Sequence, residues 1–414
     1  MLKNLYTFNL LKSINLFLLI FILNKTREEY NHILTFPSIY PSGFTLNNGN
    51  NLIAAKYGLF LYDQSSRQIK TILNFTNDEY MIKSEVDCIK TTFTQLSNQD
   101  GGFVLCLIKD ILYVFSPNIE LITNFNLKEE INGYFYSLIH YKNEGDNIYY
   151  IIAVVENKGN NYNLKIVYYK MNIKFKNNEM LYNKTIVRKS SNGNILDNFS
   201  QAVSCVKMEK SDIGQILVCF YDNRNYNEIG ISFFDLENNL EEISSLSPLF
   251  ISVTGYISIL RTAVSEDKSK AFICYLYEDY NGGAYCFFYN INSNTYTESI
   301  RYSDACRGCL NCMGAYYCSL SDQFLFFCAD NGAQYKFALF ESNQNTIINT
   351  EKENINNCYG YKTISIIFLS SILHYSILID CSEGLTSLYS IEQISKNITI
   401  KNSLNDLLSP SLIS

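Results

Sequence analysis

The chain has 414 residues, a formal net charge of −7 and no Trp, and 47% of its residues are hydrophobic. Lys and Arg are scattered along it without a long basic run, which argues against nucleic acid as a partner. Hydrophobic cores stop growing at about 250–300 residues, so a chain of this length needs an architecture that divides its core.

Residues 1–24 have the pattern of a targeting segment. Lys3 and Lys12 form a basic region, and INLFLLIFIL (14–23) forms a short apolar one. That apolar run is well below the roughly 20 residues that a helix needs to cross a membrane. The pattern predicts a signal peptide, and therefore secretion or display at the cell surface. An uncleaved signal anchor, which would tether the chain through residues 5–24, and an ordinary apolar strand are the alternatives.

One pattern recurs seven times after this segment. Each copy consists of two short apolar runs, rich in β-branched and aromatic residues, that are joined by a polar turn. The copies occupy residues 51–63, 103–116, 150–172, 216–237, 271–292, 324–343 and 375–393. Matching their turns makes the following residues equivalent: Ile53, Cys106, Ala153, Cys219, Cys274, Cys328 and Asp380. The steps between them are 53, 47, 66, 55, 54 and 52 residues.

A third apolar run precedes most copies and a weaker fourth run follows several, so the repeat predicts four strands per unit. A period near fifty residues with several strands is typical of a β-propeller blade. In architecture the chain resembles β-propeller ectodomains over about residues 30–400, without a WD40, kelch, integrin or sialidase motif. We predict an all-β fold: a seven-bladed β-propeller of four-stranded antiparallel blades, followed by a tail at 401–414. Six or eight blades, a pair of β-sandwiches and a β-solenoid are the alternatives.

Cysteine placement supports an oxidising compartment, because secreted chains carry many cysteines as disulfides. The chain has 13 cysteines, and four of them occupy the equivalent second-strand position. A cysteine in a neighbouring strand of the same unit is within reach of a disulfide. This predicts the bridges Cys88–Cys106, Cys205–Cys219, Cys318–Cys328 and Cys274–Cys286. Buried thiols in the core are the alternative.

The remaining cysteines are harder to pair. Cys358 and Cys381 are candidates for a fifth bridge, although Cys381 is one residue out of register. The sequence CRGCLNC holds Cys306, Cys309 and Cys312. We interpret it as a loop disulfide with one odd thiol; zinc or an iron–sulfur cluster, and redox exchange, are the alternatives. No cofactor or metal is predicted.

Asn-x-Ser/Thr acceptors for N-glycans occur at Asn74, Asn183, Asn198 and Asn397, beside the polar segments that flank the repeats. A further acceptor, Asn24, lies too close to the expected cleavage point.

The apolar run at 363–379 has the hydropathy of a membrane-spanning helix. It contains His374 and falls where the seventh repeat needs two strands, so we predict two strands instead.

Catalytic motifs are missing from the sequence: there is no nucleophile elbow, phosphate-binding glycine loop or HExxH. His140 and His374 lie in apolar strand runs, which favours a structural imidazole. The strings nearest to a sialidase box, SEDKSKAF (265–272) and SLSDQFLF (319–326), lack its Gly and Trp. We therefore predict a secreted or cell-surface binding module that recognises a protein or a glycan through its loop faces, and no enzyme. A propeller glycoside hydrolase, with paired carboxylates, is the alternative.

Overall fold

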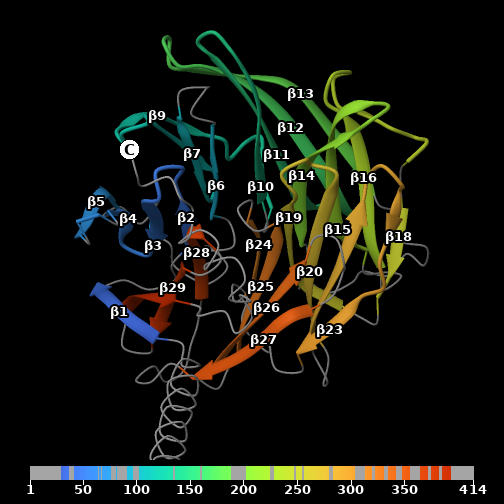
Figure 1. Ribbon diagram of the computed structural model, residues 1–414. Coiled ribbons are helices and arrows are strands. Elements are labelled where there is room, and N and C mark those ends of the chain that lie inside the picture. Colours follow the sequence, from blue (N-terminus) through green and yellow to red (C-terminus); the bar gives the residue numbers. More distant parts are fainter. Residues whose placement is uncertain are drawn as a thin grey trace, which may run out of the picture.

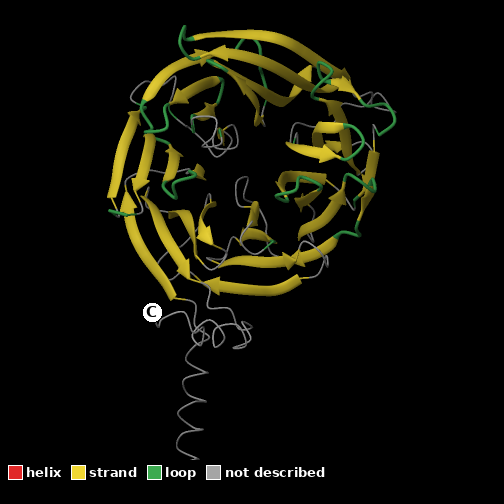
Figure 2. Ribbon diagram, turned by 45° about the horizontal axis from the view of Figure 1, so that its top comes forward, coloured by secondary structure: helices red, strands yellow, loops and turns green. Residues whose placement is uncertain are grey.

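A computed structural model describes residues 29–392 of the chain, with gaps. The gaps are 37–41, 64, 67, 76–80, 82–90, 97–101, 134–135, 159–160, 188–201, 224–227, 247–248, 254–255, 279–282, 304–312, 319–321, 331–333, 342–346, 355–363, 372–373 and 382–384. Within the described residues every regular element is a strand, and the strands form antiparallel sheets that follow one another around a ring (Figures 1 and 2). The fold is an all-β propeller of four-stranded antiparallel blades.

Each of the first three sheets is built from four consecutive strands. The first contains β2 (Ser42–Thr45), β3 (Asn51–Ala55), β4 (Gly58–Asp63) and β5 (Gln68–Asn74). The second contains β6 (Thr91–Gln95), β7 (Val104–Ile108), β8 (Ile111–Phe115) and β9 (Leu121–Asn126). The third contains β10 (Tyr136–Glu144), β11 (Asn147–Lys158), β12 (Asn161–Asn172) and β13 (Asn177–Val187). The long strands of the third sheet, with the segment that follows them, account for the 66-residue step of the repeat.

The next two sheets each carry a split fourth strand. One contains β14 (Val203–Lys210), β15 (Gly214–Asn223) and β16 (Glu228–Asp235), with β17 (Glu241–Glu242) and β18 (Leu249–Ser252) both pairing with β16. The other contains β19 (Tyr256–Val264), β20 (Lys270–Glu278) and β21 (Gly283–Asn290), with β22 (Thr295–Tyr296) and β23 (Ile300–Ser303) both pairing with β21.

The last two sheets complete the described chain. One contains β24 (Met313–Cys318), β25 (Gln323–Asp330), β26 (Gln334–Glu341) and β27 (Ile347–Asn354). The other contains β28 (Ile364–Ser371), β29 (His374–Cys381) and β30 (Leu385–Glu392). The two-strand interpretation of residues 363–379 is confirmed by β28 and β29. In the part of the chain that the structure describes, no helix is long and apolar enough to span a membrane.

The fourth strand of the last sheet comes from the other end of the chain. β1 (Glu29–Phe36) pairs antiparallel with β30, from Glu29 opposite Glu392 to Phe36 opposite Thr386. The repeat in the sequence does not predict this pairing. The pairing covers what would otherwise be an open sheet edge.

Apolar side chains on both faces of the sheets form the core. Successive residues of a strand point to opposite faces, and in β15 Leu217 and Cys219 pack toward the third sheet while Val218 and Phe220 pack toward β20. Equivalent clusters lie between the first and second sheets and between the second and third. The second strands are therefore continuously apolar, as in a sheet that is covered on both faces.

Polar side chains of the first strands link neighbouring sheets. The Cys205 backbone N–H donates to Ser137 Oγ at 3.0 Å, and Ser137 Oγ donates to the Cys205 carbonyl at 3.1 Å. Ser204 Oγ lies 2.6 Å from Thr262 Oγ1, which joins β14 to β19. These contacts fix the first strands of three sheets beside one another.

Candidate functional site

A polar pocket of about 580 Å³ lies between the fifth sheet and the sheet of β24–β27. Most of its lining comes from two turns, each of which joins the first strand of a sheet to the second strand. One turn lies between β19 and β20, and the other lies between β24 and β25. Its lining residues are Ser265, Glu266, Asp267, Ser269, Lys270, Asn290, Tyr317 and Asp322. Turns of this kind lie on one end of the ring, which we call the first-turn face. The two strings nearest to a sialidase box, 265–272 and 319–326, both contribute to this pocket.

Asp267 organises the first of these turns, between β19 and β20. Its carboxylate accepts hydrogen bonds from Ser265 Oγ at 2.6 Å, Ser269 Oγ at 2.6 Å and the Ser269 N–H at 3.1 Å. Partial burial alone would raise the pKa of Asp267, but these hydrogen bonds outweigh it and the pKa lies below its ordinary value. Asp267 is therefore ionised at neutral pH and is largely occupied in holding the turn.

Tyr317 and Asp322 form the opposite wall. Tyr317 Oη donates to Asp322 Oδ1 at 2.9 Å, and the Tyr317 ring packs on Phe324 with centroids 4.9 Å apart. Burial, followed by the hydrogen bond to Asp322, raises the pKa of Tyr317 to about 12. Tyr317 thus remains a neutral aromatic wall with its hydroxyl directed to a carboxylate.

The rim of the pocket carries the groups that are open to a ligand. Glu266 and Asp322 are exposed, while Lys270 and Asn290 are half-buried. Carboxylates and an amide beside an aromatic ring can bind a hydroxyl-rich or cationic group through hydrogen bonds. Across the described residues, no three or more His, Cys, Asp or Glu side chains are grouped so as to hold a metal ion.

A second polar cluster lies at the opposite end of the ring, between the second and third sheets. Tyr136 Oη donates to Asp110 Oδ1 at 2.8 Å, and Lys165 Nζ lies 3.1 Å from Glu156 Oε1. Lys165 also donates to the carbonyl of Glu130, in the segment that links the two sheets. The side chains of Lys165 and Glu156 are only 14% and 6% exposed. Breaking such a buried ion pair leaves an uncompensated charge, which fixes Lys165 in position. Through its hydrogen bond to the Glu130 carbonyl, Lys165 holds the segment that links the two sheets.

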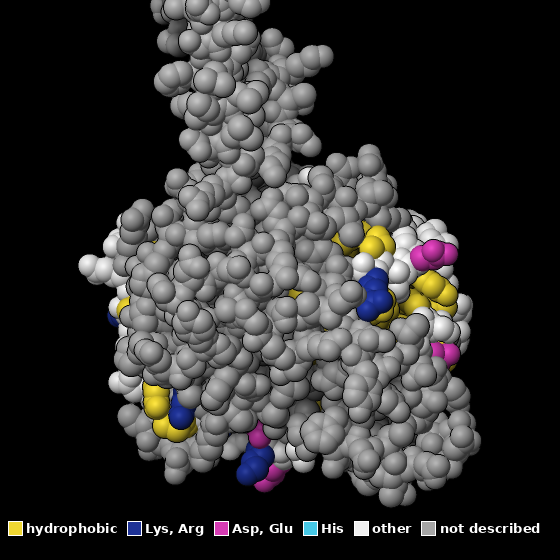
Figure 3. Space-filling model, turned by 90° about the horizontal axis from the view of Figure 1, so that it is seen from below, with side chains coloured by type: hydrophobic (Ala, Val, Ile, Leu, Met, Phe, Trp, Pro, Cys, Tyr) yellow, Lys and Arg dark blue, Asp and Glu magenta, His cyan; other side chains and the backbone are white. Residues whose placement is uncertain are grey.

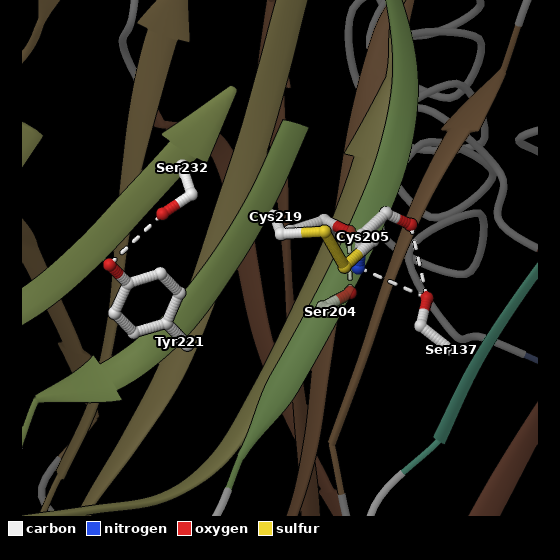
Figure 4. Close-up of a disulfide and its surroundings, with 7 residues drawn as sticks. Ser137, Ser204, Cys205, Cys219, Tyr221 and Ser232 are labelled. Atoms are coloured by element: carbon white, nitrogen blue, oxygen red, sulfur yellow. Dashed lines mark hydrogen bonds between the residues drawn. A yellow bond between two sulfur atoms is a disulfide. The ribbon is translucent and has the colours of Figure 1, made fainter. Parts of the chain in front are cut away.

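The predicted bridge Cys205–Cys219 is confirmed (Figure 4). The two residues are directly opposite in β14 and β15, with Cα atoms 4.1 Å apart. Cys205 is also the residue that Ser137 of β10 contacts, as Figure 4 shows.

Cys274 and Cys286 are also directly opposite, in β20 and β21. Their sulfur atoms are 3.0 Å apart, with the Cys286 thiol donating to Cys274, and both are free thiols in this structure. The structure places the two residues opposite each other without a bond between their sulfur atoms, so the predicted bridge stays a prediction.

Two predicted bridges are wrong. Cys106 is a buried free thiol that faces Phe93 of β6, because β6 begins at Thr91 and does not include Cys88. Cys318 is opposite Gln323, whereas Cys328 is opposite Met313. Five residues along a strand separate positions by about 16 Å, far beyond the reach of a disulfide. Cys328 is nevertheless disulfide-bonded.

The structure does not test the predicted bonds of the CRGCLNC cysteines or of Cys358 and Cys381. Cys88, Cys306, Cys309, Cys312 and Cys358 lie outside the described residues, and Cys381 is the last residue of β29.

Two of the predicted glycan acceptors lie on fourth strands, the outer edges of their sheets. Asn74 ends β5 and Asn183 lies in β13, and both are exposed. Asn198 and Asn397 lie outside the described residues. Glycosylation stays a prediction, which the masses of the peptides that carry Asn74 and Asn183, before and after amidase treatment, would test.

Comparison with known proteins shows the fold alone. No family model matches the chain, and no curated protein matches it in sequence. A chain of a mitotic checkpoint complex aligns with a TM-score of 0.50 at 6% identity, covering 88% of this chain and 95% of that one. The WD40 domain of SCAP from fission yeast aligns with a TM-score of 0.45 at 11% identity, covering 89% and 95%. An α-L-arabinanase of Penicillium chrysogenum aligns with a TM-score of 0.42 at 10% identity, covering 86% and 93%.

Proposed function

We propose that the chain is an extracellular or cell-surface binding module, which recognises a protein or a glycan through the first-turn face of its propeller. The pocket between the β19–β20 and β24–β25 turns carries this proposal. It is open at the surface and combines carboxylates, an amide and an aromatic wall. Figure 3 shows one face of the molecule, on whose described part acidic and basic side chains are interspersed. This mixture suits a specific pocket better than binding to a polyanion.

Seven blades in one closed ring are part of the same proposal. The strands pair into seven sheets, and side-chain clusters fill the space between five consecutive ones. Phe272 contacts Phe324 of β25, with ring centroids 5.3 Å apart, which extends the packing to a sixth sheet. Contacts of β28 with β24 and with β2 support closure through the seventh.

Export follows from residues 1–24 and is supported by the Cys205–Cys219 disulfide, since such bonds persist in oxidising compartments. A reporter carrying residues 1–30 should enter the secretory pathway. A wholly cytosolic reporter would contradict this part of the proposal.

The test of binding uses charge-neutral variants of the pocket rim. The purified protein is applied to an array of oligosaccharides and to a library of displayed extracellular domains. For the ligand that binds most tightly in these screens, the double variant Glu266→Gln/Asp322→Asn should raise the Kd at least about tenfold. This is the effect of losing one or two charge-assisted hydrogen bonds. Glu120→Gln/Glu129→Gln is the control, because it makes the same change in charge at two exposed residues outside the pocket. Equal binding by both variants and the unmodified protein would exclude the pocket as the binding site.

The pocket also supports the alternative function, a glycoside hydrolase, because three exposed carboxylates, Glu266, Asp267 and Asp322, line it. A panel of aryl glycosides separates the two functions. If the protein hydrolyses an aryl glycoside and Asp322→Asn alone abolishes that hydrolysis, the protein is a glycoside hydrolase rather than a binding module.

A further inference from the structure

The thiols of Cys274 and Cys286 contact each other within the fifth sheet. They occupy directly opposed positions of β20 and β21, their sulfur atoms lie 3.0 Å apart, and neither side chain is exposed. In the preceding sheet, the equivalent second-strand residue Cys219 is bonded to Cys205 of the first strand. The two sheets thus use the same position but opposite neighbours.

We propose that Cys274 and Cys286 are joined by a disulfide in the mature protein, and that this bond forms before the sheets pack over the two residues. Opposed residues of an antiparallel pair have their Cβ atoms close enough for a disulfide after a small adjustment. The existing contact between the sulfur atoms shows that both side chains already point toward each other.

The oxidation needs an electron acceptor, which we identify by class as a small-molecule or protein disulfide. The thiolate of one cysteine attacks this disulfide, which forms a mixed disulfide and releases one thiol. The second cysteine then displaces the other half of the acceptor. Two S–H bonds are lost as protons, one Cys274–Cys286 bond forms, and two electrons reduce the acceptor to two thiols.

Burial determines when this can happen. Burial, followed by the hydrogen bond from Cys286, raises the pKa of Cys274 well above its ordinary value. The thiolate is the reactive species, and a disulfide reagent needs access to it. Strand alternation places Cys274 on the same face as Phe272, which packs against β25. The exchange is therefore suppressed once the sheet of β24–β27 covers this face.

Cys106 provides a comparison within the same molecule. It is equally buried at the equivalent second-strand position, but Phe93 and Tyr113 are opposite it. Burial raises the pKa of this thiol too. Because the residues opposite it in both neighbouring strands are aromatic, Cys106 should stay a thiol under conditions that oxidise the pair.

Peptide mapping of the secreted protein tests the proposal. The protein is denatured without reduction, alkylated, digested with chymotrypsin and examined by mass spectrometry. We expect a linked pair of peptides that contains Cys274 and Cys286 and separates on reduction, together with alkylated Cys106. Alkylation of both Cys274 and Cys286 in the secreted protein would overturn the proposal.

Two variants and one kinetic measurement complete the test. In Cys274→Ser, Cys286 should become alkylated, whereas Cys106→Ser should leave the linked pair unchanged. Protein that has folded in the reduced state should resist glutathione disulfide until denaturant is added. Equal rates of oxidation with and without denaturant would overturn the proposed order of events. The mapping of the unmodified protein decides the bond itself even where a variant fails to fold.

Discussion

The equivalent second-strand position holds different residues in different sheets, and its chemistry depends on what lies opposite. Cys219 meets Cys205 on the first-strand side, and Cys274 meets Cys286 on the third-strand side. Cys106 meets Phe93 and Tyr113. The position is buried in each case, so a small residue fits it whether or not it is cross-linked.

Replacing the confirmed bridge should destabilise the fourth sheet first. The bond closes a loop with a sequence separation of 14 residues. In the chain-entropy model, a loop of this length contributes about 3 kcal/mol to the free energy of unfolding. We expect Cys205→Ala/Cys219→Ala to lose about this amount in urea denaturation, with faster hydrogen exchange in β14 and β15. Cys106→Ala is the matched control and should lose about 1 kcal/mol, the cost of a small cavity. Equal losses in the two variants would show that the bridge adds nothing beyond packing.

At the scale of elements, the segment that links β9 to β10 packs closely against the third sheet. In the link between β9 and β10, the Gly133 N–H donates to Tyr136 Oη at 3.3 Å. A Cβ at Gly133 would lie 2.2 Å from Val154 Cγ2 and 2.8 Å from the Val155 carbonyl oxygen. Both contacts come from β11, so the backbone of the link rests directly on the third sheet.

Gly133→Ala should therefore force the link away from β11. Overpacking of this kind costs about 1–3 kcal/mol, and the displaced link would also loosen the contact between Lys165 and Glu130. Urea denaturation measures the loss. Gly145→Ala serves as the control, because a Cβ there meets nothing within 4 Å and pays only for its positive φ of 60°. That backbone penalty is about 1–2 kcal/mol. A smaller loss for Gly133→Ala than for Gly145→Ala would contradict the close approach.

At the scale of the whole molecule, β1 joins the first described residues to the last sheet. Its register with β30 shifts between His32 and Leu34, and β2, the first strand of the first sheet, begins at Ser42. A strand from one end of the chain that completes the sheet at the other end makes unfolding of the ring cooperative, because neither end can leave alone.

Removing β1 should open the ring. A variant that keeps a secretion signal but lacks residues 29–36 would expose the edge of β30, and exposed edges pair with other chains. We expect a lower and broader thermal transition and larger species in size-exclusion chromatography. Exchanging only residues 1–24 for another secretion signal should leave both unchanged. A monomer with an unaltered transition after loss of residues 29–36 would show that the ring does not depend on this strand.

Repetition made much of the fold predictable from the sequence. The equivalent positions from Ile53 to Asp380 all lie in second strands, and the run at 363–379 forms two strands. A strand covered on both faces is apolar along its length, and this pattern is local, so the sequence shows it directly. The Cys205–Cys219 bridge could be predicted in the same way, because the sequence shows both strands of that hairpin as apolar runs.

Register and distant pairing were decided only by the tertiary structure. Counting apolar runs places Cys318 beside Cys328, yet the register of β24 with β25 puts Cys318 opposite Gln323. The residues of β30 that pair with β1 lie 350 to 363 positions away along the chain, and no local pattern marks them. The candidate pocket likewise unites two turns from different sheets. The sequence by itself determined which segments form strands and that the second strands are buried on both faces, because the pattern of apolar residues along a strand is local. Three-dimensional closure decided which strands and turns meet, because those contacts depend on the packing of the whole ring.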